Sequence, residues 1–561
     1  MNKLLLSAVT VCSIAALTSC NKKLGELKSD YFTTTPTPLE ATASKVPGTV
    51  SGSIPQKYFS KNAELKITPV LVYGEKESTG TPYTVQGEKV QANNQVISYN
   101  DGGTVTVPFN FDYTDDMLKS DLYLDFDVTQ GKKTYTLPRT KVGYGVVATS
   151  TLAKAENVTP ATTPDAFQRI VNEKYNANIM FLINQTNVRS SETTSDAVIA
   201  LNNKLKEAQK ADSLQVEGVK IDSYASPEGG VEVNTRIAEG RENSTRAYLE
   251  KSLKDSKVKD FGELTANFTA QDWEGFQKLV SESNIQDKEL ILSVLSMYKD
   301  PQDREREIRN MSSVFDQLKQ DVLPKLRYSR LTASINVIGK SDDQLKDAYA
   351  KNPSSLSVDE LLYTATLYNN DADKQAEIYA KTAEIYPNDY RAYNNLGKVQ
   401  YIKGDYSSAS ANFDKAAQLA PDSKEVSMNQ GLIALQKDDL DSARQKFGNA
   451  AGATDLPDAL GTYYIKSGDV AQAANAFGDS KTNNAAIAQV LNKDYSKAAS
   501  TLNSVENPNA TTYYVKAIVA ARTNNSQDVL SNLQKAASMD SSLATRAKSD
   551  IEFSKYDLSS L

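Results

Sequence analysis

The chain has 561 residues, and its 63 Lys and Arg residues against 70 Asp and Glu residues give a net charge of −7. This balance indicates neither nucleic-acid binding nor an electrostatic hold on anionic lipid. Histidine is absent and the cysteines are Cys12 and Cys20. Ser-His-Asp and Cys-His nucleophile systems and Cys/His zinc sites are therefore excluded. At ~100–200 residues per domain, the length predicts three or four domains.

We expect no catalytic residues, no metal site and no cofactor. A pair of carboxylates of the glycosidase kind and a Ser-Lys pair stay open on composition alone, but no local arrangement of residues favours either. An enzyme is therefore the weakest of the function classes considered below.

The amino terminus combines a positive start at Lys3, an apolar run ending near Leu17, and the sequence Leu17-Thr18-Ser19-Cys20. The apolar run is too short for a permanent membrane span and is typical of a signal peptide. The motif resembles the lipobox of bacterial lipoproteins, which implies removal of residues 1–19 and lipid attachment at Cys20. The alternative is an ordinary secretory leader. No later stretch reaches the ~20 apolar residues of a membrane span, so the lipid is the expected anchor.

Residues 20–46 are polar and centre on Thr33-Thr34-Thr35-Pro36-Thr37-Pro38, which predicts an extended tether. Asn21, Lys22 and Lys23 follow Cys20 without an acidic run. In the Gram-negative phyla that move lipoproteins to the cell surface, these lipoproteins resemble one another in carrying an acidic cluster just after the lipidated cysteine. Its absence favours the periplasmic face of the outer membrane.

Residues 47–150 alternate between apolar and polar side chains. Leu122, Leu124, Phe126 and Val128 fall on one face of a predicted strand, and further strands are expected at Leu65–Tyr73 and Val105–Phe111. Turn sequences around Gly102 and Gly131 separate these strands. The pattern predicts a β-sandwich of immunoglobulin-like size.

Residues 165–341 predict an α/β domain. An apolar strand at Ile179–Asn184 precedes a helix at Ser195–Gln209 and a strand through Val216 and Ile221. A loop rich in Pro and Gly then leads into a second amphipathic helix, the order of a βα unit.

The loop and second helix carry a family signature. The matching positions are Gly229, Asn234, Ile237, Arg241, Tyr248 and Leu249. This run resembles the peptidoglycan-binding signature of the OmpA C-terminal domain. In that family a loop Asp and the helix Arg hold the amine and the carboxylate of diaminopimelate.

The resemblance implies peptidoglycan binding through Glu228, Asn234 and Arg241. Arg241 matches the family's Arg, but Ser226 stands where the family has Asp. Glu228 is a nearby carboxylate able to bind an ammonium group. The structural alternatives are a surface arginine beside Glu239 or Glu242, and a plain loop carboxylate at Glu228.

About 80 residues separate Leu249 from the closing strand predicted at Leu331–Val337. They include predicted helices near Leu290–Tyr298 and Asp303–Arg309. We interpret this segment as a helical insert that adds packing to the domain, with Trp273 in its core.

The region 350–561 repeats with a period of 34 residues, seen first at Pro353, Pro387 and Pro421. Further pairs keep this register: Leu362/Leu396, Gly397/Gly431, Ala409/Ala443, Phe413/Phe447 and Ala416/Ala450. Shorter repeats follow at Gly461/Ala473/Phe477, Ala498/Leu502 and Ala517/Val529/Leu533. The pattern is similar to the tetratricopeptide (TPR) signature, which implies about six helical hairpins in a superhelix with a concave groove for a partner's peptide or helix.

The predicted fold class is therefore a multidomain chain: a β-sandwich, an α/β OmpA-like domain with a helical insert, and an all-α TPR superhelix. The leading hypothesis is a non-enzymatic lipoprotein scaffold of a Gram-negative outer membrane, lipid-anchored on its periplasmic face. Its expected partners are the outer membrane through Cys20, peptidoglycan through the OmpA-like domain, and proteins through the TPR groove. The alternative is a surface-exposed lipoprotein that binds a glycan or a protein.

Overall fold

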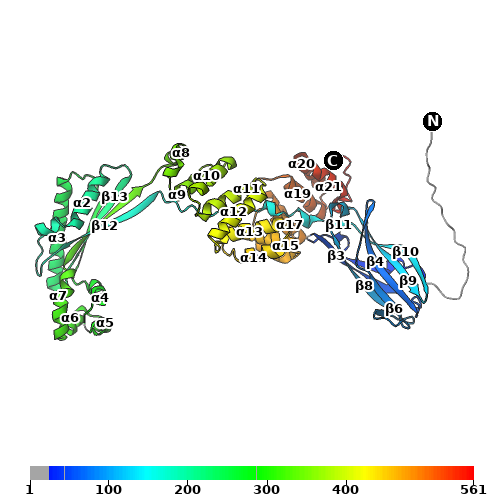
Figure 1. The fold of residues 1–561 in the computed structure, drawn as a ribbon, viewed down its shortest axis with the longest axis horizontal. Helices are drawn as coiled ribbons and strands as arrows, with labels where there is room; N and C mark the ends of the chain where they lie inside the picture. Colours follow the sequence, from blue (N-terminus) through cyan, green and yellow to red (C-terminus); the bar gives the residue numbers. More distant parts are fainter. Residues whose placement is uncertain (1–23, 43, 286) are drawn as a thin grey trace, which may run out of the picture. The chain divides into compact units, whose positions relative to one another are not determined.

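The computed structural model describes residues 24–42, 44–285 and 287–561. The chain divides into two units. The first unit combines the residues up to Pro164 with Tyr368–Leu561, and the second comprises Asp165–Leu367. Cys20 lies outside the described residues. The β-domain and most of the helical repeats therefore belong to the first unit (Figure 1). The second unit is inserted between them in the sequence.

The β-domain of the first unit is a two-sheet sandwich. One sheet has the order β1-β3-β8, and the other has the order β10-β9-β4-β6-β7 with β5 beside β4. The predicted alternation in β9 is confirmed, because Leu122, Leu124, Phe126 and Val128 are all buried. Gly131 has φ +60° in the turn between β9 and β10, a conformation that glycine adopts without strain.

The strands have the following bounds: β1 Phe32–Thr35, β2 Leu39–Glu40, β3 Lys45–Ile54, β4 Ala63–Tyr73, β5 Lys76–Thr79, β6 Tyr83–Gly87, β7 Gln95–Ile97, β8 Gly103–Asp112, β9 Asp121–Gln130, β10 Lys133–Tyr144 and β11 Val146–Val147. Short 3-10 helices lie at Ser29–Tyr31 and Asp115–Leu118.

The described part of the predicted tether belongs to the β-domain. Strand β1 pairs antiparallel with β3, and β2 pairs in parallel with β11. Leu24 and Leu27 are buried in the β-domain core, and the Thr140 hydroxyl donates to the Leu27 carbonyl at 2.6 Å. An extended tether over residues 24–46 is therefore wrong. Polar Thr and Pro residues occupy an edge strand and its turn, where composition alone resembles a linker.

The helices of the first unit form consecutive antiparallel pairs, the expected TPR arrangement. The small residue of each first helix lies against the large apolar residue of the second. A Cβ atom on Gly397, Gly431 or Gly461 would come within 2.7, 2.5 or 2.4 Å of the ring of Phe413, Phe447 or Phe477, respectively. The repeated glycines therefore allow this close helix packing.

These helices are α10 Ala372–Ile385, α11 Tyr390–Ile402, α12 Tyr406–Leu419, α13 Lys424–Gln436, α14 Leu440–Gly448, α15 Leu456–Ser467, α16 Val470–Phe477, α17 Asn483–Leu491, α18 Tyr495–Asn503, α19 Ala510–Arg522, α20 Ser526–Met539 and α21 Ser542–Ser549. The predicted degenerate repeat at Ala498 and Leu502 is the pair α17–α18, in which both residues are buried.

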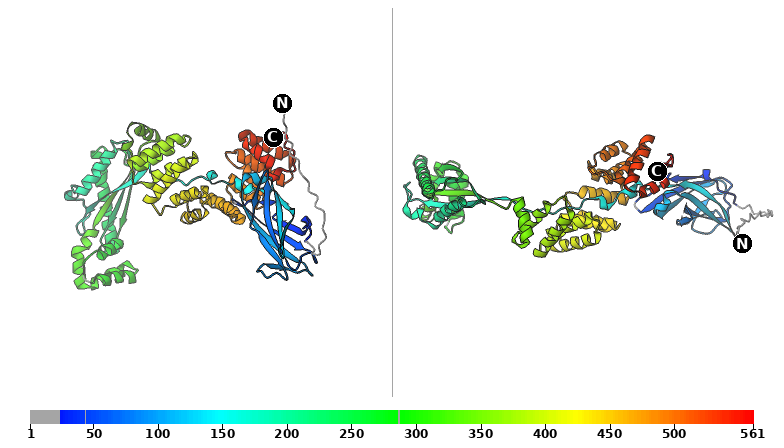
Figure 2. Two further views of the ribbon diagram at one scale, coloured as in Figure 1. Left: turned by 45° about the vertical axis from the view of Figure 1, so that its right-hand side comes forward. Right: turned by 90° about the horizontal axis from the view of Figure 1, so that it is seen from above.

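The second unit is an α/β domain with a sheet of order β12-β15-β13-β14, in which β14 is parallel to β13 and the other pairs are antiparallel. Helices α2 and α3 share one core with the sheet, and Figure 2 shows them from two directions. Alternate residues of β15, Leu331, Ala333 and Ile335, lie in this core. The predicted strand–helix–strand–helix order is confirmed.

Its elements are β12 Ile170–Met180, α1 Ser190–Thr193, α2 Asp196–Ala208, β13 Leu214–Tyr224, α3 Val231–Asp255, β14 Glu263–Thr269, α4 Trp273–Ser281, α5 Lys288–Met297, α6 Pro301–Asn310, α7 Ser312–Asp321, β15 Tyr328–Ile338, α8 Asp342–Lys351 and α9 Val358–Thr366.

Two details of this domain differ from the sequence predictions. The first strand runs over Ile170–Met180 rather than over Ile179–Asn184; it ends early because residues 181–185 turn away and Asn184 has φ +56°. The predicted insert also contains β14, which joins the sheet, so the true insertion begins after it. Helices α4–α7 have a core of their own, and Trp273 is half-buried at its edge, 5.6 Å from Phe276 between ring centres.

Candidate peptide-binding groove and signature loop

The segment that follows the β-domain in sequence and precedes the second unit runs along the helical array of the first unit. We call residues 152–163 the strap; it begins in a 3-10 helix at Thr149–Leu152 and includes another at Ala155–Asn157. It forms the cyan trace among the yellow and orange helices in Figures 1 and 2. Residues 152–163 lie between the predicted β-sandwich and α/β domains in sequence, and in the structure they occupy the predicted groove.

Asparagine side chains hold the strap by its backbone. Asn429 accepts a hydrogen bond from the Ala161 N–H at 2.7 Å and donates to the Ala161 carbonyl at 2.9 Å. Asn395 likewise accepts from the Thr163 N–H at 2.9 Å and donates to the Thr163 carbonyl at 3.0 Å. Each amide thus pairs with both polar groups of one residue, as a neighbouring β-strand would.

Residues of a later and an earlier repeat hold the other end of the strap. Asn484 donates to the Lys154 carbonyl at 2.8 Å, and the buried Tyr401 hydroxyl donates to the Ala155 carbonyl at 2.8 Å. Polar groups of the strap that would otherwise be buried without partners are in this way satisfied by the array.

The asparagines occupy equivalent repeat positions. Asn395 and Asn429 are 34 residues apart, each two residues before the glycine of its first helix. Asn484 stands two residues before Ala486, which corresponds to that glycine in the α17–α18 pair. We call these three residues the amide ladder. The sequence analysis missed it, although asparagine recurs at this one position of the repeat and could have been found there.

The apolar side chains of the strap complete two cores of the array. Leu152 and Ala153 belong to the core of the last repeats, while Ala155, Val158 and Ala161 belong to the core of the earlier ones. Ala155 and Ala161 are both 0% exposed. The strap is therefore packed as interior chain rather than laid on a surface.

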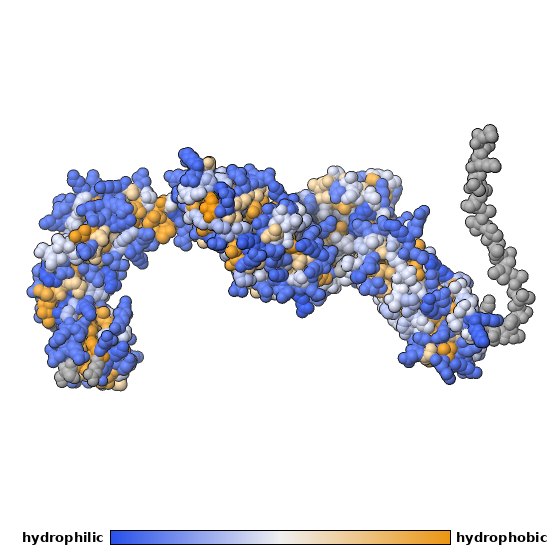
Figure 3. Space-filling view, in the orientation of Figure 1, coloured by the Kyte–Doolittle hydropathy of each residue, from blue (hydrophilic) through white to orange (hydrophobic). Residues whose placement is uncertain are grey.

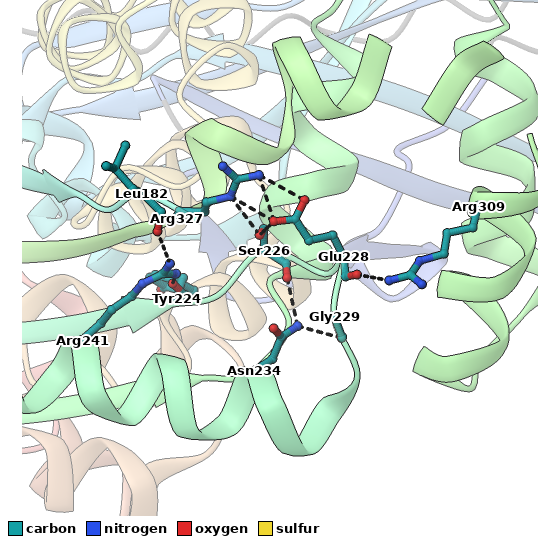
Figure 4. A network of polar contacts seen from close by, with 9 residues as sticks. All are labelled: Leu182, Tyr224, Ser226, Glu228, Gly229, Asn234, Arg241, Arg309 and Arg327. Carbon is teal, nitrogen blue, oxygen red and sulfur yellow. Dashed lines mark hydrogen bonds and ion pairs between the residues drawn. The ribbon is translucent and has the colours of Figure 1, made fainter. Parts of the chain in front are cut away.

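The predicted wall-binding residues lie in the second unit, around the loop between β13 and α3; we call residues 225–230 the signature loop (Figure 4). Asn234 fixes this loop, because its side-chain amide donates to the carbonyls of Ser226 and Gly229 at 2.9 and 2.8 Å. The structure thus brings Asn234 and Glu228 to the same loop.

Glu228 is already paired. The guanidinium of Arg327 makes two hydrogen bonds of 3.0 Å to its carboxylate, and the Ser226 hydroxyl donates to the same carboxylate at 2.9 Å. The side chains of Arg327 and Glu228 are only 11% and 16% exposed. Sequence reasoning missed Arg327, which lies just before β15 and far along the chain.

Arg241 lies beneath the loop and is 1% exposed. Its guanidinium donates to the carbonyls of Tyr224, Gln185 and Leu182 at 2.7, 3.1 and 3.3 Å. It also lies over the Phe181 ring, 5.1 Å from the ring centre. Burial, with the nearby charge of Arg327, lowers the Arg241 pKa to about 10, so the side chain stays charged at neutral pH. The alternative of a surface arginine is wrong, because Arg241 is enclosed and ties its helix to the end of β13 and to the turn at residues 181–185.

Carboxylates of the β-domain that the sequence places in pairs have basic partners. Asp125 binds Arg139, Asp127 binds Lys66 and Asp116 binds Lys76. Over residues 24–42, 44–285 and 287–561, no group of His, Cys, Asp and Glu side chains is arranged to hold a metal ion. The helices in these ranges include none long and apolar enough to cross a membrane.

Comparison with known proteins gives no match to a protein-family model and none to a curated protein. Among solved structures, the chain is similar to a TPR protein from Parabacteroides merdae, with 14% identity, a TM-score of 0.30, and coverage of 44% of this chain and 98% of that one.

The chain is also similar to Pseudomonas aeruginosa PilF, with 17% identity, a TM-score of 0.28, and coverage of 36% and 95%. Similarity to a chain of the APC/C hetero-tetramer Cut9-Hcn1 has 16% identity, a TM-score of 0.32, and coverage of 37% of this chain and 45% of that one. The TPR assignment rests on this chain's own sequence period and helix pairs.

Proposed function

We propose that this protein is a non-enzymatic scaffold that recruits protein partners of the cell envelope through its TPR array. The observation that carries this proposal is the repeat face that holds an extended segment by its backbone. Asparagines at equivalent positions of three repeats make hydrogen bonds to the backbone of one segment. A surface of this kind is suited to binding polypeptide and offers no chemistry for a reaction.

Recruitment is tested by photo-crosslinking in cells. A photoreactive amino acid replaces Tyr393 or Tyr513 on the array, with Tyr123 of the β-domain as the control position. All three side chains are half-buried, so each site is partly accessible. We expect a discrete protein adduct from at least one array position and none from Tyr123. Absence of adducts at both array positions contradicts recruitment of partners by the array.

We further propose that the chain is an outer-membrane lipoprotein anchored through Cys20 on the periplasmic face. The support is the lipobox-like sequence at the amino terminus. Leu24 already lies in the β-domain core, and the chain from Cys20 to Leu24 spans at most about 15 Å at ~3.6 Å per residue. A lipid on Cys20 would therefore hold the β-domain close to the membrane surface.

The anchor is tested with Cys20→Ser. We expect the wild type to incorporate labelled fatty acid and to fractionate with outer membranes, and the variant to do neither. Protease added to intact cells then distinguishes the two faces of the membrane. Resistance supports the periplasmic location, whereas digestion supports the alternative of a surface-exposed binding lipoprotein.

Peptidoglycan is the second candidate ligand, supported by the signature residues that hold the loop. Glu228 is paired with Arg327 and Arg241 is enclosed, so wall binding in our proposal requires the Glu228–Arg327 pair to open. Sedimentation of the lipid-free protein with purified sacculi tests this. We expect wild type to pellet, Glu228→Ala to stay in solution, and the exposed control Arg236→Ala to pellet. Soluble wild type removes peptidoglycan from the list of ligands.

A further inference from the structure

We propose that the TPR groove is a peptide receptor whose resident ligand is the strap of the same chain, and that this ligand closes the groove to peptides from other molecules. The inference goes beyond the proposed scaffold role, because it identifies which ligand the groove takes. It also implies that partners which leave the strap in place dock on other faces of the protein.

The hydrogen bonds define a ligand class. Asn429 and Asn395 bind the N–H and C=O groups of Ala161 and Thr163, which are alternate residues of an extended segment. Backbone pairing of this kind requires extended chain and does not depend on side-chain identity. Pro160 stands directly before Ala161 in the sequence, and because proline has no N–H to donate, it needs no acceptor in the groove.

Specificity comes from the buried side chains. Val158 is 3% exposed, and Ala155 and Ala161 of the strap are enclosed within the array core. A branched or charged side chain at an alanine position would overlap neighbouring atoms of a close-packed interior. The groove therefore selects a peptide that has small apolar residues at these positions, with a helical turn at the first and hydrogen-bonded backbone at the second.

The strap excludes competitors by occupancy and by proximity. Its buried residues leave no volume for a second chain along the same amides. Because it is covalently attached at both ends, its effective concentration at the groove is on the order of millimolar. A free peptide of equal intrinsic affinity would therefore bind only after the strap leaves.

The direct test measures binding of a fluorescent peptide with the sequence of residues 152–163, capped at both ends, to the full chain carrying Cys20→Ser. We expect wild type to bind at least tenfold more weakly than Ala161→Arg, which puts a charge where the strap is enclosed. Thr159→Arg is the matched control, because Thr159 is exposed, and it should behave like wild type.

The groove side of the contact is tested by adding Asn429→Ala to Ala161→Arg. We expect peptide affinity to fall at least tenfold again, because Asn429 accepts from the N–H of residue 161 and donates to its carbonyl, which also accepts from Asn394. A folded Ala161→Arg variant that does not bind the peptide overturns the receptor. Equal binding by wild type and Ala161→Arg overturns the closure.

Hydrogen exchange keeps the proposal testable if Ala161→Arg does not fold. The amides of Ala161 and Thr163 in wild type should exchange as slowly as the array core, and Asn429→Ala should selectively speed exchange at Ala161. Fast exchange of both amides in wild type contradicts a resident strap. A concentration-dependent dimer cross-linked from strap to groove would place the strap in a second copy, against the proposal. Loss of photo-adducts in cells bears on recruitment alone, so the two proposals fail separately.

Discussion

The TPR groove and the signature loop are both filled by groups of the same chain, but they are filled in different ways. In the groove, neutral amides bind the backbone of a whole segment, and apolar side chains of that segment complete the core. In the loop, one guanidinium binds one carboxylate at a site that is still partly exposed. The groove opens only if the strap unpacks, whereas the Glu228 carboxylate is freed by breaking its bonds to Arg327 and Ser226.

The two sites therefore differ in what is lost when the bound group is released. Releasing the strap exposes apolar surface and leaves several backbone groups without partners. Releasing Arg327 returns two ions to water, where both are well solvated. We therefore expect changes in the groove to act on the stability of the first unit, and changes at Glu228 to act on the loop alone.

The largest expected effect comes from the residue beneath the loop. Arg241→Ala removes the donor to three backbone carbonyls and leaves a cavity at a side chain that is 1% exposed. We expect it to lower the free energy of unfolding of the second unit by about 3–5 kcal/mol. Arg236→Ala, exposed on the same helix, is the control and should have little effect. Thermal unfolding measures the difference in stability, and hydrogen exchange of residues 181–185 shows whether the turn beside Arg241 is loosened. An unchanged unfolding midpoint would assign Arg241 no structural role.

Asn429→Ala is the next in size and acts on the groove. It leaves the buried N–H of Ala161 without an acceptor, and we expect a loss of about 2–3 kcal/mol in the first unit. Asn475→Ala on the exposed side of α16 is the matched control. Chemical denaturation compares the two. Equal effects of both variants would show that the amide ladder contributes nothing specific.

The Glu228–Arg327 pair is measured by a double-mutant cycle with Glu228→Gln and Arg327→Gln. The two side chains are hydrogen-bonded to each other and both are mostly buried. We therefore expect a coupling energy of about 1–2 kcal/mol. Hydrogen exchange of the signature loop should rise in each single variant, while exchange of the sheet stays unchanged. A coupling energy near zero would mean that the pair does not hold the loop.

The smallest expected effect comes from an exposed residue of the strap. Thr162 is exposed, and its hydroxyl accepts a hydrogen bond from Lys398. Thr162→Ala should change the free energy of unfolding by no more than about 0.5 kcal/mol. A loss as large as that of Asn429→Ala would show that surface contacts, rather than the buried amides, retain the strap.

Much of the architecture was predictable because local periodicity reports it. The alternation of Leu122 and Phe126 with polar residues gave the strand β9, and the 34-residue period gave the helix pairs of the array. Strand β14 was missed because Glu263–Thr269 has little buried surface and lies at the edge of the sheet. A short edge strand leaves a weak hydrophobic pattern.

The candidate sites were predictable only in part. The signature placed Asn234 at its loop, but the partner of Glu228 is Arg327, which no spacing rule connects to it. The strap resembles a Thr- and Pro-containing linker, and nothing in its own residues shows that the array encloses it. Both partners are contributed by chain distant in sequence, and their pairing depends on burial.

The sequence by itself determined the lipobox-like start, the order of the domain types and the repeat period, because each is written in the spacing of neighbouring residues. Only the tertiary structure decided that the early polar segment joins the β-domain, that Arg241 is enclosed, and that the groove is occupied. These features depend on which distant groups meet. The free energy of burying a polar or apolar group is set by those neighbours and not by the local sequence.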